Sequence, residues 1–153
     1  MKLSLTKCIE NFQKIIEFKK EHKDNVILLI GNHDFHYIHS IGLSSRYDYL
    51  NRNMLIEIFT RNLDLFQLAY YHDFNGKKII FSHAGITKPW LKHVGYDSNK
   101  IELSNLATYL NDLLKSSDKR LIKSLGMVSK YTYEKNLEIG VAMVGGAIVV
   151  SLI

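Results

Sequence analysis

The stretch NVILLIGNHD, residues 25–34, decides the fold. Its apolar run, residues 26–30, has the continuous hydrophobicity of a strand that is buried on both faces, as in the sheets of α/β proteins. Gly31 follows at once, and a glycine allows the chain to turn sharply. We therefore expect the polar residues 32–34 at the carboxyl end of a strand, where α/β sheets bind their ligands.

A second run of the same kind ends at His83. Residues 78–82 are predicted to form a strand, and residues 66–74 a strand before it. Asn75 and Gly76 between them are a strong signal for a two-residue hairpin turn, because both positions tolerate a positive φ angle. An amide oxygen and a histidine at one strand end, with a further histidine at another, form a donor set that suits a metal ion.

Helices are expected around these strands. Four segments are predicted to be helical: 5–22, 51–62, 103–114 and 118–125. Pro89 is expected to open a further short helix. Asn99 and Glu102, three residues apart, form a capping pattern ahead of the leucine-rich helix. Together with the strands, these helices predict an α/β fold.

Composition and charge are those of an ordinary globular domain. The chain has 153 residues, of which 46% are hydrophobic and 23% charged, and this length fits a single domain over residues 1–153. The net charge of +5 comes from lysines spread among glutamates. Without a dense basic block, specific binding of nucleic acid is not expected.

The single cysteine and the two chain ends bear on the compartment. Cys8 lies on the apolar face of the first predicted helix, so we expect a buried structural thiol in a reducing, cytoplasmic setting. No signal peptide is visible. Residues 139–153 carry no charge but are shorter than the ~20 residues that span a bilayer. A hairpin or a pair of buried strands is therefore preferred there over a membrane anchor.

Two motifs resemble those of a known family. Residues 31–34, GNHD, are similar to the GNH[D/E] motif of calcineurin-like metallophosphoesterases, and residues 81–85, FSHAG, are similar to that family's later strand-end histidine motif. Their order and their separation of about 50 residues also agree. The subgroup most resembled is the serine/threonine-phosphatase-like proteins of bacteria and phages. The resemblance implies a partial metallophosphoesterase β-sandwich flanked by helices, with residues 99–125 as a small helical cap-like insertion.

The resemblance also implies roles for individual residues. Asn32 and His83 would bind one ion of a binuclear centre of Mn, Fe or Zn, and His33 would be the general acid that protonates the leaving group. Asp34 would support its neighbours without binding metal. The implied substrate is a phosphorylated protein or small molecule, and the implied activity is that of a metal-dependent phosphatase.

Three further residues are weaker candidates for binding phosphate or metal. Arg46 is a candidate phosphate clamp, because arginine binds phosphate oxygens in a bidentate manner, although an exposed loop arginine explains it slightly better. His36 and His39, three residues apart, could belong to a zinc site on a helix. No further ligand pattern supports that zinc site, and surface histidines are the preferred interpretation.

Part of the family pattern has no counterpart here. The family's GDxHG and GDxxD[RN]G motifs supply the first metal and the bridging aspartate, but no glycine in this chain is followed by Asp or His. We therefore expect a fragment of a longer phosphatase. Two neutral ligands hold a divalent ion poorly, so the chain alone should be weak or inactive. The alternative is a degenerate, non-catalytic domain that binds a partner. Missing strands would leave sheet edges open to association.

Overall fold

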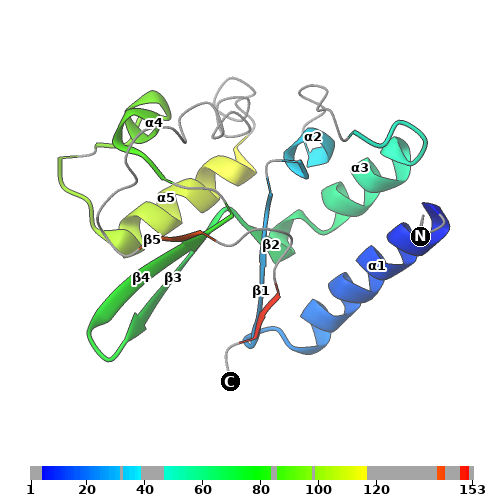
Figure 1. The fold of residues 1–153 in the computed structure, drawn as a ribbon, viewed down its shortest axis with the longest axis horizontal. Helices are drawn as coiled ribbons and strands as arrows, with labels where there is room; N and C mark the ends of the chain where they lie inside the picture. The colour runs from blue at the N-terminus through cyan, green and yellow to red at the C-terminus, as the bar shows by residue number, and fades with distance from the viewer. Residues whose placement is uncertain are drawn as a thin grey trace.

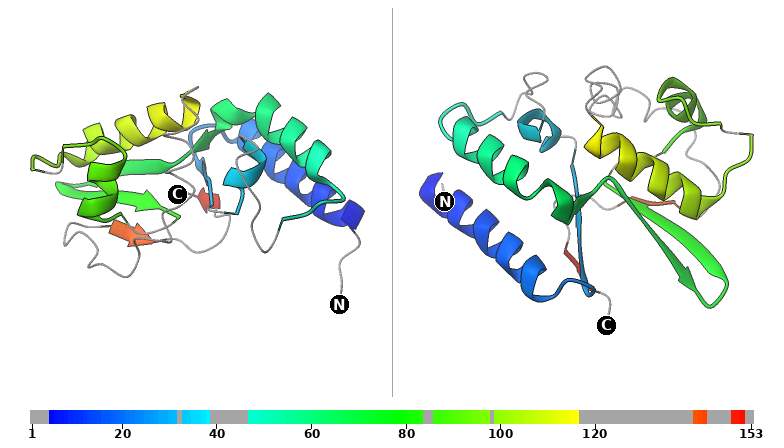
Figure 2. Two further views of the ribbon diagram at one scale, coloured as in Figure 1. Left: turned by 90° about the horizontal axis from the view of Figure 1, so that it is seen from above. Right: turned by 180° about the vertical axis from the view of Figure 1, so that it is seen from behind.

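The structure is a computed structural model that describes residues 5–31, 33–38, 47–83, 86–97, 99–116, 141–143 and 149–151. Two small mixed sheets lie next to each other, with helices packed along the outside of each (Figure 1). Figure 2 shows the same arrangement from above and from behind. This combination of helices and two sheets confirms the predicted α/β class with a partial β-sandwich.

The first sheet has the strand order β2-β1-β6. Its central strand β1 (Val26–Leu29) is buried along its whole length, as the apolar run predicts. β2 (Phe66–Gln67) pairs with it in parallel and β6 (Val149–Ser151) in antiparallel orientation. The helices α1 (Leu5–Glu21) and α3 (Arg52–Arg61) run side by side along this sheet (Figures 1 and 2).

The second sheet has the order β3-β4-β5. β3 (Ala69–Phe74) and β4 (Lys77–Ser82) form the predicted antiparallel hairpin, and β5 (Val141–Met143) pairs with β4 in parallel. At the hairpin turn, Asn75 has a φ of 55° and Gly76 a φ of 88°. Both angles are positive, as a tight two-residue hairpin turn requires.

Two strand predictions were wrong in their connections. Residues 66–74 were expected to form one strand, but the structure divides them at Leu68 into β2 of the first sheet and β3 of the second. Residues 139–153 were expected to form a hairpin or a pair of buried strands; they contain two strands, β5 and β6, but these belong to different sheets, so the hairpin was wrong. In both cases the local pattern correctly indicates extended backbone. It cannot indicate which sheet edge that backbone meets.

Three helices and one short turn complete the described fold: α2 (Phe35–Ile38), the 3-10 turn η1 (Leu63–Leu65), α4 (Lys88–His93) and α5 (Leu103–Lys115). Pro89 lies in the first turn of α4, as predicted, and the Thr87 hydroxyl caps that helix by accepting from Trp90 N at 3.3 Å. The cap predicted at Asn99 was wrong. Glu102 itself caps α5, because its carboxylate accepts from Asn105 N at 3.1 Å.

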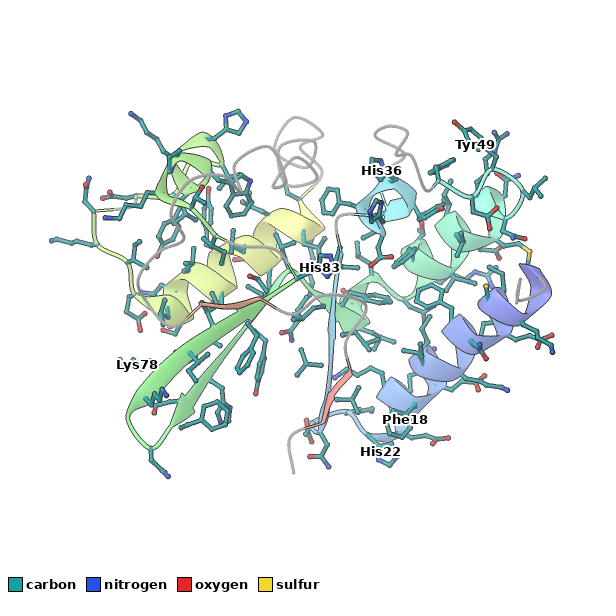
Figure 3. All side chains as sticks on the ribbon, in the orientation of Figure 1. Phe18, His22, His36, Tyr49, Lys78 and His83 are labelled. Carbon is teal, nitrogen blue, oxygen red and sulfur yellow. The ribbon has the colours of Figure 1, made fainter. Side chains whose placement is uncertain are left out.

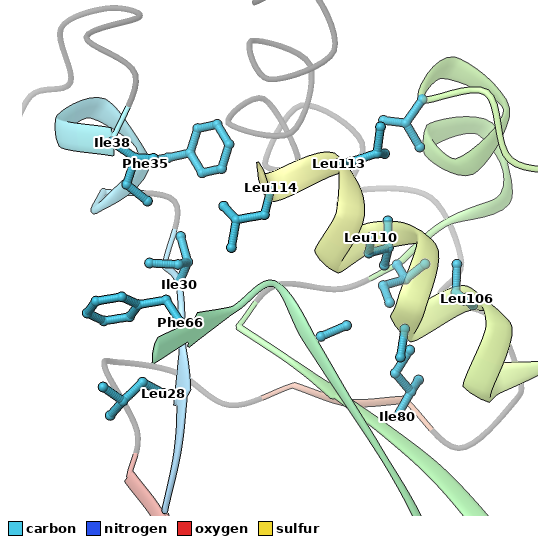
Figure 4. Close-up of a cluster of buried hydrophobic side chains, with 14 of the residues drawn as sticks. Leu28, Ile30, Phe35, Ile38, Phe66, Ile80, Leu106, Leu110, Leu113 and Leu114 are labelled. Carbon is cyan, nitrogen blue, oxygen red and sulfur yellow. The ribbon is translucent and has the colours of Figure 1, made fainter. Parts of the chain in front are cut away.

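One apolar core joins the two sheets. It runs from β1 and β2 through α2 to the inner face of α5 and then to Ile80 of β4 (Figure 4). The predicted leucine stripe forms the buried face of α5: Leu103, Leu106, Ala107, Leu110, Leu113 and Leu114. This stripe packs in the same core as residues of β1, β2 and β4, so it contributes to holding the two sheets next to each other.

Cys8 was predicted to be buried, and the structure shows it exposed. The buried positions of α1 are Ile9 and Ile16, with Phe12 packed partly against the core. Consecutive residues on a helix point about 100° apart, so Cys8 faces solvent beside the buried Ile9.

Several predictions concern residues outside the described ranges. These are Asn32, His39, Arg46 and the helix predicted at residues 118–125. That predicted helix lies in the second half of the predicted cap segment. The domain assignment, with its cap-like insertion, stays a prediction. Among the described residues, no helix is long and apolar enough to cross a membrane.

Candidate functional site

The ends of β1 and β4 meet, although the two strands belong to different sheets. A β-carbon placed on Gly31 would lie 3.2 Å from both Cε1 and Nε2 of His83. Figure 3 shows His83 in the middle of the molecule, beside the end of β1 from which residue 31 follows. Two motifs that are about 50 residues apart in the sequence therefore form one local site.

Glycine at position 31 fits this close approach without displacing its neighbours. The same β-carbon would also lie 3.0 Å from Oδ2 of Asp34. Contacts of this length are shorter than carbon and oxygen atoms tolerate without moving. A side chain at position 31 would therefore require Asp34 or His83 to shift.

A hydrogen-bonded turn leads the chain out of β1. The Asp34 carboxylate accepts from Gly31 N at 2.9 Å. In return, Gly31 O accepts from Asp34 N at 3.1 Å and from Phe35 N at 3.2 Å. Phe35 is buried in the core at the start of α2, so the turn is anchored on its far side. Asp34 thus closes the turn that carries residues 32 and 33, and this position is compatible with its predicted role of supporting its neighbours.

The electrostatics of the site centre on Asp34. Burial raises the pKa of its carboxyl group, while the hydrogen bond from Gly31 N and the nearby charges of His83 and His33 act to lower it. Both imidazoles are therefore close enough to Asp34 to influence its charge. The site consists of one half-buried carboxylate between two half-buried histidines, and Nδ1 of His83 is buried.

The structure thus brings together three of the five residues singled out from the sequence: His33, Asp34 and His83. Their chemical roles stay predictions, as do those of Asn32 and Arg46. Sequence reasoning missed one residue that bonds to the backbone where the chain passes from β2 to β3, Asn111 of α5. Its only signal is an amide next to the leucine stripe of an amphipathic helix, and that signal is weak.

The described residues do not by themselves fit a binuclear metal centre. They include no group of three or more His, Cys, Asp or Glu side chains that could hold an ion. The Asp34 carboxylate, whose charge interacts with that of His83, already accepts a hydrogen bond from its own turn. Tightly bound divalent metals usually have at least three protein ligands, often with anionic charge among them.

Comparison with known families identifies the domain. A family model described as calcineurin-like phosphoesterase matches residues 6–138, which include both strand-end motifs. The chain belongs to the calcineurin-like phosphoesterase family. This agrees with the resemblance found in the motifs, and the family as a whole hydrolyses phosphoesters with divalent metals. No curated protein and no solved structure matches the chain significantly.

Proposed function

We propose that this calcineurin-like phosphoesterase chain carries one half of a phosphatase active site. In that half, Asn32 and His83 are ligands of one divalent ion, Mn, Fe or Zn, and His33 is the general acid for the leaving-group oxygen. The supporting observation is the close approach of Gly31 to the His83 ring, which would lie 3.2 Å from a β-carbon at position 31. The proposed substrate is a phosphorylated protein or small molecule.

His33 suits the role of proton donor. An imidazole changes its charge near neutral pH, so it can give up a proton under ordinary conditions. His33 is half-buried, and its charge and that of Asp34 interact.

We further propose that the chain by itself is a weak phosphatase or an inactive one. Neutral imidazole and amide ligands do not neutralise a divalent ion, and a single pair of them leaves most of its coordination positions to water. A complete centre needs anionic ligands in addition to the side chains described here.

Metal binding tests the ligand assignment. We expect the full chain to bind Mn²⁺ weakly in a titration followed by electron paramagnetic resonance, and His83→Ala to abolish that binding. His22→Ala is the matched control, because His22 is exposed and lies at the opposite end of β1 (Figure 3). Binding that survives His83→Ala would contradict the assignment.

Hydrolysis of p-nitrophenyl phosphate tests the activity. With added Mn²⁺, we expect turnover by the full chain near the uncatalysed background. If turnover is measurable, His33→Ala should remove it, whereas His36→Ala on α2 should retain it. Fast turnover that depends on His33 would show that the chain is a competent enzyme and would contradict the proposed weakness. Turnover unaffected by His33→Ala would contradict the proposed general acid.

A further inference from the structure

The chain passes from the first sheet to the second in a single residue, Leu68. On one side of it, Ile30 N at the end of β1 donates to Gln67 O at 2.9 Å. On the other side, Ala69 opens β3, which pairs with β4. This crossing therefore joins β2 and β3, which pair with the two strands, β1 and β4, whose carboxyl ends carry the candidate site.

At the crossing, one side chain takes the place of a neighbouring strand. The Asn111 amide oxygen accepts from Leu68 N at 2.8 Å and from Ala69 N at 3.1 Å. Its amide nitrogen donates to Ala69 O at 2.8 Å. A side-chain amide has the same donor and acceptor as a peptide group. Asn111 thus satisfies three backbone groups at the point where the chain changes sheets.

Asn111 is itself held in place by its helix. Its neighbour Leu110 is only 1% exposed, and Leu114, one turn further on, is fully buried. Both belong to the face of α5 that packs on the second sheet and faces the core (Figure 4). Because the core is close-packed, the helix backbone that carries Asn111 is held in place, and three hydrogen bonds orient its amide. The crossing is therefore fixed to a rigid support.

We propose that Asn111 is a positioning residue, which sets how closely the turn at Gly31 approaches His83. A role of Asn111 in catalysis rests on the proposed function. Its effect on the distance between the Gly31 turn and His83 does not. A site must be held to within about 0.5 Å of its working geometry. The only direct link along the chain between β2 and β3 is the crossing that Asn111 holds.

Nuclear magnetic resonance on the isotope-labelled full chain tests this proposal. The short distance from Gly31 to the His83 ring predicts a nuclear Overhauser effect between the Hα protons of Gly31 and Hε1 of His83. We expect it to be lost in Asn111→Ala, which removes all three hydrogen bonds. In Asn111→Asp, which keeps the two acceptor bonds but loses the donor to Ala69 O, we expect it to be weakened.

Two controls separate position from stability. Gly76→Ala destabilises the far end of the hairpin, where Gly76 has a φ of 88°, without touching the crossing. Thr108→Ala removes a bond within α5, from Thr108 Oγ1 to Ser104 O. Both controls should keep the signal. A purely stabilising role for Asn111 would predict that Gly76→Ala weakens it as well, and that result would overturn the proposal.

The remaining outcomes are also decisive. A signal that persists in folded Asn111→Ala would overturn the proposal, as would its absence from the unsubstituted chain. If Asn111→Ala does not fold, Asn111→Asp is the deciding variant. An unchanged nuclear Overhauser effect in Asn111→Asp would contradict the proposal, and a weakened one would support it. Failure of the proposed function would appear separately, as metal binding that does not depend on His83, with the effects of Asn111 on the signal unaltered.

Discussion

The inner face of α5 and the rim where β1 and β4 end are held by different forces. Leu106 and Leu114 are fully buried among apolar neighbours, so that face depends on the area removed from water. At the rim, Gly31 N donates to Asp34 at 2.9 Å, and a β-carbon added to Gly31 would lie only 3.2 Å from the His83 ring, so this region depends on a polar bond and on close steric fit. Substitutions in the core should therefore change stability, whereas those at the rim should change geometry as well.

The largest expected effect is in the core. Leu110 is 1% exposed, and Leu110→Ala removes three buried carbons and leaves a cavity, so we expect a loss of about 3 kcal/mol in the free energy of unfolding. Urea denaturation followed by circular dichroism measures it. Leu50→Ala is the matched control, because Leu50 is 81% exposed and its loss should cost less than about 0.5 kcal/mol. Equal losses in the two variants would show that burial does not govern stability here.

Gly31→Ala should have the next largest effect, and it probes the rim directly. The added β-carbon would lie 3.0 Å from Asp34 Oδ2 and 3.2 Å from the His83 ring, so we expect a loss of about 2 kcal/mol from forced displacement. Urea denaturation gives the loss, and the nuclear magnetic resonance signals of the His83 ring report the displacement. An unchanged ring spectrum would contradict the close approach of the two strand ends.

Gly76→Ala is also a substitution of glycine by alanine, but its expected loss of stability has a different physical cause. No atom lies within 4 Å of the added β-carbon, but Gly76 has a φ of 88°, which costs a residue with a side chain about 1 kcal/mol. The loss should appear in urea denaturation without any change in the His83 spectrum. A change at His83 would show that the hairpin turn and the rim are coupled, which would break the distinction between the regions.

These two glycines also show what the sequence could and could not predict. The turn at Asn75 and Gly76 follows from local residue types, and so do the strands that it connects. The leucine stripe of α5 likewise follows from helical spacing. Each of these features depends on residues that are neighbours in the chain, and the structure confirms each of them.

Features that depend on distant partners were not predictable in the same way. Extended backbone at residues 66–74 looks the same whether it meets one sheet or two, so the division at Leu68 was missed. The approach of the Gly31 turn to His83 was expected from the polar residues at two strand ends and from the family resemblance, but not from any local pattern that shows which strands meet. Asn111 lies 42 residues from Ala69, to which it bonds, and nothing local marks an amide as the partner of a distant strand.

The smallest expected effect is electrostatic and concerns the turn before α3. The Asp48 carboxylate accepts from Asn51 Nδ2 at 2.8 Å, from Leu50 N at 3.0 Å and from Asn51 N at 3.1 Å. The hydrogen bond from the Asn51 side chain, followed by those from the two backbone amides, lowers the pKa of Asp48, and the partial burial of the carboxyl opposes this. This turn is stabilised mainly when the carboxylate is charged.

The sign of the pH dependence follows from this lowered pKa. A carboxyl whose pKa is lower in the folded state stabilises the fold above its unfolded pKa of about 3.9 and loses this contribution as the pH falls through the folded value. We expect the stability difference between the unsubstituted chain and Asp48→Asn to be constant from neutral pH to about pH 5, at below about 0.5 kcal/mol because the site is exposed to solvent. Below about pH 4 the difference should shrink.

Urea denaturation at a series of pH values measures this difference, with Asp64→Asn as the control. The Asp64 side chain is 93% exposed and has Lys115 at 3.7 Å, a distance at which an exposed ion pair adds little. Its difference from the unsubstituted chain should stay near zero at every pH. If the Asp48 difference grew in acid, its carboxylate would be destabilising the turn. The Asp48 turn would then differ from the turn at the rim, which the hydrogen bond from Gly31 N to the Asp34 carboxylate closes.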